Sequence, residues 1–257
     1  MPRLERHQPN TPAWFDLMTS DADAARAFYG ELFGWDFDIQ GPEYGHYAVG
    51  MKDGGIAAGL GQLPPDAGFP PSWTVYFAVE SADAAVEAAQ AHGGQAMMPP
   101  MDVGTQGRMA IIVDKTGAVF GVWQPKEHTG ATIVQEPGSM AWCEVNTRDA
   151  AGARAFYEGV FGLSTKAIEA GGGTEYYTMH LGEMTIAGIL QMTADWGELP
   201  PHWMAYFSVA DTDASAEKVK SLGGKLLHGP FDTPYGRMAV VMDPQGAVFS
   251  IIKPSYL

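Results

Sequence analysis

Two acidic residues stand among aromatic and sulfur-containing neighbours in a way that suits proton transfer or hydrogen bonding. Asp16 lies in the segment WFDLM (14–18), and Glu144 lies in WCEVN (142–146). Because alternate residues of a strand share a face, each carboxylate is expected beside the tryptophan two positions earlier. A carboxyl group among apolar side chains has a raised pKa and can act as a general base. Asp16 and Glu144 are therefore candidate catalytic residues. The alternative is that each only accepts hydrogen bonds from a neighbouring Tyr, Trp or backbone group.

Both acidic segments belong to a long internal repeat. Three pairs of segments match: WFDLMTSDADAARAFYGELFGW (14–35) with WCEVNTRDAAGARAFYEGVFGL (142–163), WTVYFAV (73–79) with WMAYFSV (203–209), and GRMAIIVDKTGAVF (107–120) with GRMAVVMDPQGAVF (236–249). The offset stays close to 129 residues throughout, so only short changes in loop length separate two homologous halves. We predict a first domain over residues 11–124, a linker over 125–138 and a second domain over 139–254.

Each half is predicted to contain two rounds of one strand, one helix and three strands. Asp21 suits the N-cap of the first helix, and Gly34 suits the residue after its end. Between them, apolar residues recur at the spacing of one helix face: Ala25, Phe28, Tyr29 and Leu32. A second round begins at 73–79 and continues to residue 123. The chain therefore reads as an α+β protein of four βαβββ modules, two in each half.

Two motifs give this pattern a family resemblance. FYxxxFG closes the first helix at 28–34, and DxxGAVF precedes the last strand at 114–120. With the four modules, they resemble the vicinal oxygen chelate superfamily of glyoxalases, bleomycin-resistance proteins and extradiol dioxygenases, in its tandem two-domain actinobacterial type. The resemblance covers residues 11–254. It implies two tandem domains, each a pair of βαβββ modules that form an open curved sheet with helices on the outer face.

The resemblance also implies a metal triad, which this sequence lacks. Enzymatic members chelate a divalent ion with His, Gln or Glu on the first, fifth and eighth strands of a half. Counted from shared landmarks, these positions hold Trp14, Thr74 and Gly121 in one half and Trp142, Met204 and Ser250 in the other. None is a good ligand for a hard or borderline divalent ion, so we predict neither a metal nor another cofactor. A shifted, incomplete site at Glu144 and His202 remains an alternative.

The same alternation predicts which side chains line the two clefts. The candidate ligand-binding residues are Trp14, Met18, Thr74 and Tyr76 in the first half and Trp142, His202, Met204, Tyr206 and Ile252 in the second. Aromatic and methionine walls with few polar groups suit a small apolar or aromatic molecule. Whether Tyr47 and Tyr177 line the clefts or fill the core is left open, as is whether each cleft forms within a half or between the halves.

Other polar residues carry weaker signals. Arg108 and Arg237 recur in the GRMA segments and are candidates for binding an anionic group, although a surface or hairpin-anchoring role is favoured. The histidines without repeat partners are expected to be mostly exposed to solvent: His46, His92, His128, His180 and His228.

Composition excludes several partners. Fifteen Lys and Arg against thirty Asp and Glu give a net charge of −15, which argues against nucleic acid and against anionic membranes. No apolar run is long enough to span a bilayer, and the N-terminus lacks the apolar stretch of a secretory signal. The single cysteine, Cys143, excludes an intramolecular disulfide. We expect a cytoplasmic protein that is a monomer with an internal pseudo-dimer, or a homodimer.

Three classes of function compete. The favoured class is a metal-independent protein that binds a small molecule, as bleomycin-resistance relatives do. The second is an enzyme, either a glyoxalase-like lyase or a cofactor-poor oxygenase, hydroxylase or isomerase, with Asp16 or Glu144 as its base. The third is a structural or regulatory protein with vestigial clefts. One fold hosts many chemistries in this superfamily, so the resemblance alone does not decide.

Overall fold

The computed structural model describes residues 3–169 and 174–256. The first half contains β1 (Pro12–Thr19), α1 (Ala22–Phe33), β2 (Asp36–Ile39), the short 3-10 helix η1 (Pro42–Tyr44), β3 (Ala48–Lys52), β4 (Gly55–Gln62), β5 (Ser72–Ala78), α2 (Ala82–Ala91), β6 (Gln95–Val103), β7 (Gly107–Val113) and β8 (Val119–Pro125).

The second half repeats this order. It contains β9 (Met140–Thr147), α3 (Ala150–Phe161), β10 (Ser164–Glu169), β11 (Glu175–Leu181), β12 (Met184–Gln191), the 3-10 helix η2 (Ala194–Trp196), β13 (His202–Ser208), α4 (Thr212–Ser221), β14 (Lys225–Thr233), β15 (Gly236–Met242) and β16 (Val248–Pro254).

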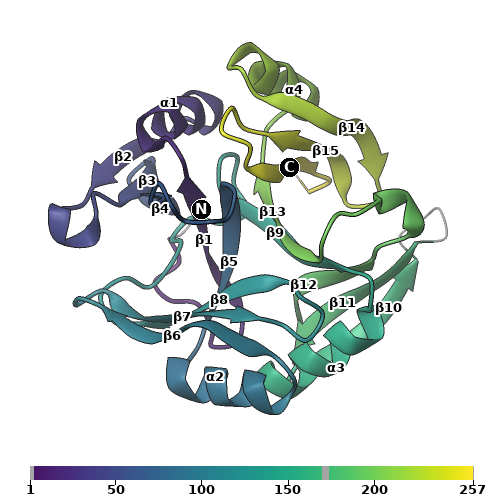
Figure 1. Cartoon of the computed structure of the whole chain (residues 1–257). Helices are drawn as coiled ribbons and strands as arrows, with labels where there is room; N and C mark the ends of the chain where they lie inside the picture. The colour runs from purple at the N-terminus through teal and green to yellow at the C-terminus, as the bar shows by residue number, and fades with distance from the viewer. Residues whose placement is uncertain (1–2, 170–173, 257) are drawn as a thin grey trace.

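Each half forms one eight-stranded mixed sheet. The orders are β2-β3-β4-β1-β5-β8-β7-β6 and β10-β11-β12-β9-β13-β16-β15-β14, which are the same order in repeat-equivalent strands. In each half, the first strand of one module pairs antiparallel with the first strand of the other (β1 with β5, β9 with β13). Two βαβββ modules therefore join edge to edge in each half (Figure 1), and the predicted tandem α+β fold is confirmed.

The helix ends follow the residues that the sequence offers. The Asp21 carboxylate accepts from the backbone N–H of Ala24 at 3.0 Å, and Gly34 ends α1 with a left-handed φ of 73°. Asp149 and Gly162 repeat the two roles at the ends of α3. The predicted N-cap and the predicted helix end are both confirmed. They recur because the repeat preserved a short polar cap and a residue without a Cβ.

The two sheets share one hydrophobic core. Phe207 of β13 contacts Phe15 of β1 and Phe33 of α1, with ring centroids 5.5 and 5.0 Å apart. Phe77 of β5 contacts Phe161 of α3 at 4.8 Å. Figure 1 shows the helices at the periphery, α1 beside α4 and α2 beside α3. Each sheet therefore buries one of its faces against the other half.

The alternation along β1 and β9 separates these two faces. Phe15 and Leu17 are fully buried in the shared core. Strand alternation directs Trp14 and Asp16 to the other face of β1, where both are also buried. On the corresponding face of the second sheet, an apolar cluster separate from the main core contains Met204, Tyr206 and Ile252, packed against Trp142 and four further residues. The residues of this second-half cluster all lie on β9, β13, β15 and β16.

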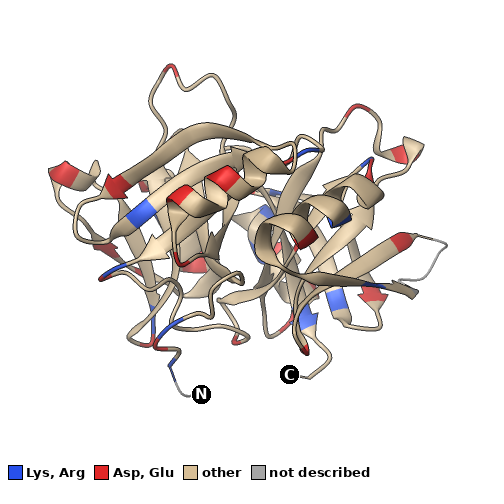
Figure 2. Ribbon diagram, turned by 90° about the horizontal axis from the view of Figure 1, so that it is seen from below, with Lys and Arg blue, Asp and Glu red and all other residues tan. Residues whose placement is uncertain are grey.

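Most acidic and basic residues lie outside this core, although the carboxylates of Asp16, Asp114, Glu144 and Asp243 are buried. Acidic and basic residues are interspersed along the helices, loops and strand ends of both halves (Figure 2). Within residues 3–169 and 174–256, no helix is long and apolar enough to cross a membrane.

Candidate functional site

The carboxylate of the second half, Glu144, lies in a closed hydrogen-bond network. It is 6% exposed on β9, and it accepts from the Tyr206 hydroxyl at 2.7 Å and from the Tyr176 hydroxyl at 2.8 Å, one at each oxygen. The indole Nε1 of Trp142 donates to the Tyr176 hydroxyl at 3.0 Å. Burial raises the pKa of Glu144, and the bonds from Tyr206, Tyr176 and Trp142 oppose that rise. Both of its oxygens therefore already have protein donors.

The carboxylate of the first half, Asp16, lies in a similar network that is incomplete. The Tyr47 hydroxyl donates to its Oδ2 at 2.7 Å, and Trp14 Nε1 donates to that hydroxyl at 3.0 Å. Oδ1 of Asp16 is buried without a hydrogen-bond partner. Burial raises the pKa of Asp16 to about 6, and the Tyr47 bond opposes the rise. An unpaired carboxylate oxygen in an apolar setting is costly, so this atom marks a candidate site.

The difference between the halves comes from one methylene group. Tyr76 is the repeat counterpart of Tyr206, and each stands directly opposite the cleft tryptophan of its half, Trp14 or Trp142. In the second half the longer Glu144 reaches that tyrosine. In the first half, no hydrogen bond joins Tyr76 to Asp16 or to any other side chain of the described ranges, and the two are linked only by electrostatic repulsion that raises the pKa of Tyr76 further.

Two glycines leave room for the tyrosines that bind these carboxylates. A Cβ on Gly59 of β4 would collide with the hydroxyl of Tyr47, and a Cβ on Gly188 of β12 would collide with the hydroxyl of Tyr176. Gly59 is the strand partner of Asp16, and Gly188 is the strand partner of Glu144. The missing side chain on the neighbouring strand is therefore what lets each hydroxyl approach the carboxylate.

The structure decides between the two roles that the sequence left open for Tyr177. It is half-buried and packs against the main core, and its hydroxyl donates to Glu175 at 2.6 Å. The neighbouring Tyr176 is the residue that binds Glu144, and sequence reasoning missed it. The repeat offset of 129 residues from Tyr47 points to residue 176, so the signal was present. Adjacent strand residues face opposite ways, so Tyr176 and Tyr177 lie on opposite faces of β11.

The structure also corrects two histidines that were expected to be exposed. His180 is only 7% exposed, with Nε2 at 2.8 Å from the hydroxyl of Thr178 and Nδ1 at 3.3 Å from the hydroxyl of Thr185. His128, expected to be exposed, packs against Trp14 with ring centroids 4.5 Å apart and lies 5.6 Å from the ring of Trp123. Its Nε2 is buried without a hydrogen-bond partner. Burial, with a smaller contribution from His7, lowers the pKa of His128 to about 4. His128 follows β8 in the linker, and no periodic pattern there indicated that the linker folds back onto the cleft face.

The remaining predicted residues lie on the cleft faces with differing exposure. Met18 and Thr74 are half-buried in the first half, and Tyr76 is buried. His202 is half-buried at the end of the second cleft face, where its Nε2 lies 3.2 Å from Nδ2 of Asn146 and its Nδ1 lies 2.8 Å from the carbonyl oxygen of Pro200. Both of its ring nitrogens therefore already have polar neighbours.

The donor set does not fit the divalent ion that the fold family implies. Trp14, Thr74 and Gly121 occupy the expected positions in the first half, and an indole nitrogen, a neutral hydroxyl and no side chain at all are not a ligand set for such an ion. In the part of the chain that the structure describes, no group of three or more His, Cys, Asp or Glu residues is arranged to hold a metal. Glu144 and His202, the shifted alternative, bind other protein groups.

The two recurring arginines form ion pairs with exposed aspartates and not with Asp16 or Glu144. Arg108 binds Asp83, near the start of α2, through two nitrogens at 2.8 and 2.9 Å, and also Asp102 at 3.2 Å. Arg237 repeats the arrangement with Asp213 and Asp232. These pairs join a hairpin to the first turn of a helix, which is the anchoring role favoured from the sequence.

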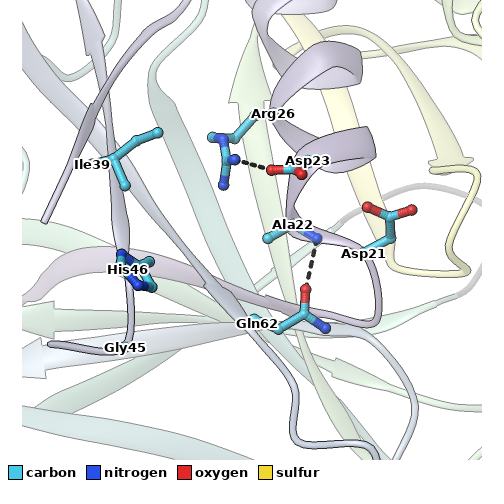
Figure 3. Close-up of a pocket in the computed structure, with 8 residues that line it drawn as sticks. All are labelled: Asp21, Ala22, Asp23, Arg26, Ile39, Gly45, His46 and Gln62. Carbon is cyan, nitrogen blue, oxygen red and sulfur yellow. Dashed lines mark hydrogen bonds and ion pairs between the residues drawn. The ribbon is translucent and has the colours of Figure 1, made fainter. Parts of the chain in front are cut away.

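Two hollows border the start of α1 and the start of β9. One of about 420 Å³ borders the start of α1, where Gln62 Oε1 accepts from the backbone N–H of Ala22 at 2.9 Å and Asp23 pairs with Arg26 (Figure 3). Its polar groups serve the helix end. The other, of about 380 Å³, lies between the N-terminal segment and the start of β9, and Trp142 is among its lining residues.

Comparison with known proteins identifies the family of this fold. The model of the Glyoxalase/Bleomycin resistance protein/Dioxygenase superfamily matches residues 11–122 and 139–251. The chain is 41% identical over 261 residues to "Putative glyoxylase CFP32" of Mycobacterium tuberculosis, covering 99% of both chains. It is 37% identical to "Anthracycline biosynthesis protein DauV" of a Streptomyces species, covering 97% of this chain and 95% of that one. Among solved structures, the Mn(II)-bound glyoxalase from Novosphingobium aromaticivorans superposes with a TM-score of 0.67 at 15% identity, covering 96% of this chain and 82% of that one.

Proposed function

The chain belongs to the Glyoxalase/Bleomycin resistance protein/Dioxygenase superfamily, and we propose that it uses this fold to bind a small aromatic molecule without a metal ion. The observation that carries the proposal is the replacement of the family's chelating positions by aromatic and neutral residues around a buried carboxylate. In both halves a tryptophan stands where the first ligand is expected, and it donates to a tyrosine that binds the carboxylate.

The composition of the cleft faces supports an aromatic ligand. Trp14 and Tyr76 in one half, and Trp142, Met204 and Tyr206 in the other, offer flat or polarisable apolar surfaces. The relative from Streptomyces is named for anthracycline biosynthesis, and anthracyclines contain a hydroxylated anthraquinone. A hydroxyanthraquinone is therefore the probe that this chemistry suggests. The net charge of −15 disfavours strongly anionic ligands.

Fluorescence titration tests the proposal, because two cleft tryptophans would contact or neighbour the probe. Hydroxyanthraquinone should quench tryptophan emission with saturation, and the curve should be the same with and without EDTA. The quenching measured with Trp14→Phe and with Trp142→Phe should each be compared with the quenching measured with Tyr235→Phe, which changes an exposed residue. Absence of saturable quenching, or quenching that requires an added divalent metal, would contradict the proposal.

One observation favours a second candidate function, a cofactor-independent proton-transfer enzyme of glyoxalase or isomerase type. The pKa of Asp16 is raised to about 6, which is close to the value that suits a general base at neutral pH. The hemithioacetal of methylglyoxal and glutathione tests this candidate directly. Turnover that rises with pH through about 6, and that Asp16→Asn abolishes, would support the enzyme. Turnover unaffected by that substitution would exclude Asp16 as the base.

A further inference from the structure

The two halves contain equivalent hydrogen-bond networks, of which the second is complete and the first is not. In the second half, Glu144 joins Tyr176 and Tyr206 through two short hydrogen bonds. In the first half, Asp16 binds Tyr47 alone, its Oδ1 is buried and unpaired, and Tyr76 stands where Tyr206 stands in the other half. One methylene group separates the closed arrangement from the open one.

Resting on the proposed function, we infer that the working site lies in the first half at Asp16 and Tyr76, and that its ligand carries a hydroxyl group that donates to Oδ1 of Asp16 and accepts from the hydroxyl of Tyr76. The ligand hydroxyl then supplies the link that the longer Glu144 makes to Tyr206 within the protein. The site thus recognises an aromatic alcohol, a phenol or an enol through one group with two hydrogen bonds.

The chemistry of the two open partners selects a hydroxyl. Oδ1 of Asp16 is buried and unpaired, and an ionised carboxylate oxygen only accepts. The phenolic hydroxyl of Tyr76, which has no hydrogen bond within residues 3–169 and 174–256, can donate. A ketone or an ether would accept from Tyr76 but would leave Oδ1 unpaired. A carboxylate or phosphate would also place its negative charge against Asp16. Only a group that both donates and accepts satisfies the two partners, and a bond from a hydroxyl to a carboxylate is of the strong, charge-assisted kind.

The second half is closed to the same ligand. Entry there would require breaking a bond of 2.7 Å or one of 2.8 Å to a buried carboxylate, and each broken bond leaves a buried group unsatisfied. The network of Glu144, Tyr176 and Tyr206 therefore stabilises the second half and does not bind the ligand. The hollow beside Trp142 is the alternative place for an aromatic molecule in this half.

The closing experiment exchanges the two carboxylates. Isothermal titration calorimetry measures the binding of hydroxyanthraquinone, its methyl ether and unsubstituted anthraquinone to the full chain. The wild-type protein should bind one hydroxyanthraquinone per chain, at least tenfold more tightly than the methyl ether. Asp16→Glu should weaken binding of hydroxyanthraquinone at least tenfold and raise the melting temperature, because the longer side chain reaches Tyr76 and closes the network.

A second variant covers the case in which Asp16→Glu does not fold. Tyr76→Phe removes only a hydroxyl, and it should reduce the preference for hydroxyanthraquinone over its methyl ether to less than threefold. Equal binding of the hydroxyl compound and the ether by the wild-type protein would overturn the inference while the proposed function stands. Loss of binding in Glu144→Asp but not in Asp16→Glu would assign the ligand to the second half and also overturn it. Failure of all three compounds to bind would contradict the proposed function itself.

Discussion

The hydroxyl of Tyr157 in α3 donates to Oδ2 of Asp114, in the turn between β7 and β8 of the other half, at a distance of 2.7 Å. In the repeat-equivalent pair, the hydroxyl of Tyr29 in the first half donates to Oδ2 of Asp243 in the second half at 2.9 Å. Such reciprocal contacts are the pattern of a twofold axis relating two similar units. The two halves therefore behave like the subunits of a dimer that are joined in one chain.

These two bonds should couple the unfolding of the halves. Tyr157→Phe and Tyr29→Phe should each lower the free energy of unfolding by about 1–2 kcal/mol, because a buried carboxylate loses a donor. Tyr235→Phe, at an exposed tyrosine of the same half, should change it by less than about 0.5 kcal/mol. Urea unfolding followed by tryptophan fluorescence and by circular dichroism should show one transition in every variant. Two separate transitions would show that the halves fold independently.

Removing the two carboxylates should have unequal effects. Glu144→Ala should destabilise the fold by about 2–4 kcal/mol, since two buried tyrosine hydroxyls lose their acceptor. Asp16→Ala should destabilise it less, because only Tyr47 loses a partner and a buried unpaired oxygen is removed with the carboxylate. Thermal unfolding at pH 7 measures both. A larger loss for Asp16→Ala would mean that the first network is the more tightly satisfied one.

The raised pKa of Asp16 gives its effect on stability a definite pH dependence. Between the ordinary pKa of 3.8 and about 6, the folded state holds a proton that the unfolded state releases, so this group's contribution falls as pH rises. The difference amounts to about 3 kcal/mol above pH 6. Asp16→Asn should therefore match the wild-type melting temperature near pH 3.5 and exceed it at pH 7. An equal melting-temperature difference at both pH values would contradict the raised pKa.

The lowered pKa of His128 should make stability depend on pH in the opposite direction. Its pKa is lowered from 6.5 to about 4, so the unfolded state binds a proton in this range and the folded state does not. The contribution of His128 is complete above pH 6.5, and about 3 kcal/mol of it is lost as pH falls to 4. His128→Gln should remove that part of the acid sensitivity, leaving the part due to His7, His180 and His202, whose pKa values are also lowered by burial. Melting curves between pH 4 and 7 measure the difference. Equal acid sensitivity of the variant and the wild-type protein would contradict the burial of His128.

Metal removal should leave the protein unchanged. Purified protein should contain well under one equivalent of Zn, Ni, Fe or Mn, because the six expected ligand positions carry no suitable donor set. Its melting temperature should not fall on dialysis against EDTA, since metal binding would otherwise contribute to stability. Elemental analysis that finds one metal per chain would restore the site at Glu144 and His202.

The sequence by itself determined the repeat, the modules and the two faces of each sheet. Repetition of a 129-residue pattern indicated two like halves, and strand alternation placed Trp14 and Asp16 opposite Phe15 and Leu17. These features are local or periodic, so short-range physical rules suffice to infer them. The cap at Asp21 and the helix end at Gly34 belong to the same class.

Only the tertiary structure decided which partners the polar groups have. That Glu144 reaches two tyrosines while Asp16 reaches one depends on a methylene length and on the register of three strands. The position of His128 depends on how a linker without periodicity folds back onto Trp14. Hydrogen bonds between residues tens of positions apart are set by ångström-scale geometry across strands, and a periodic pattern carries the direction of a side chain but not the distance to its partner.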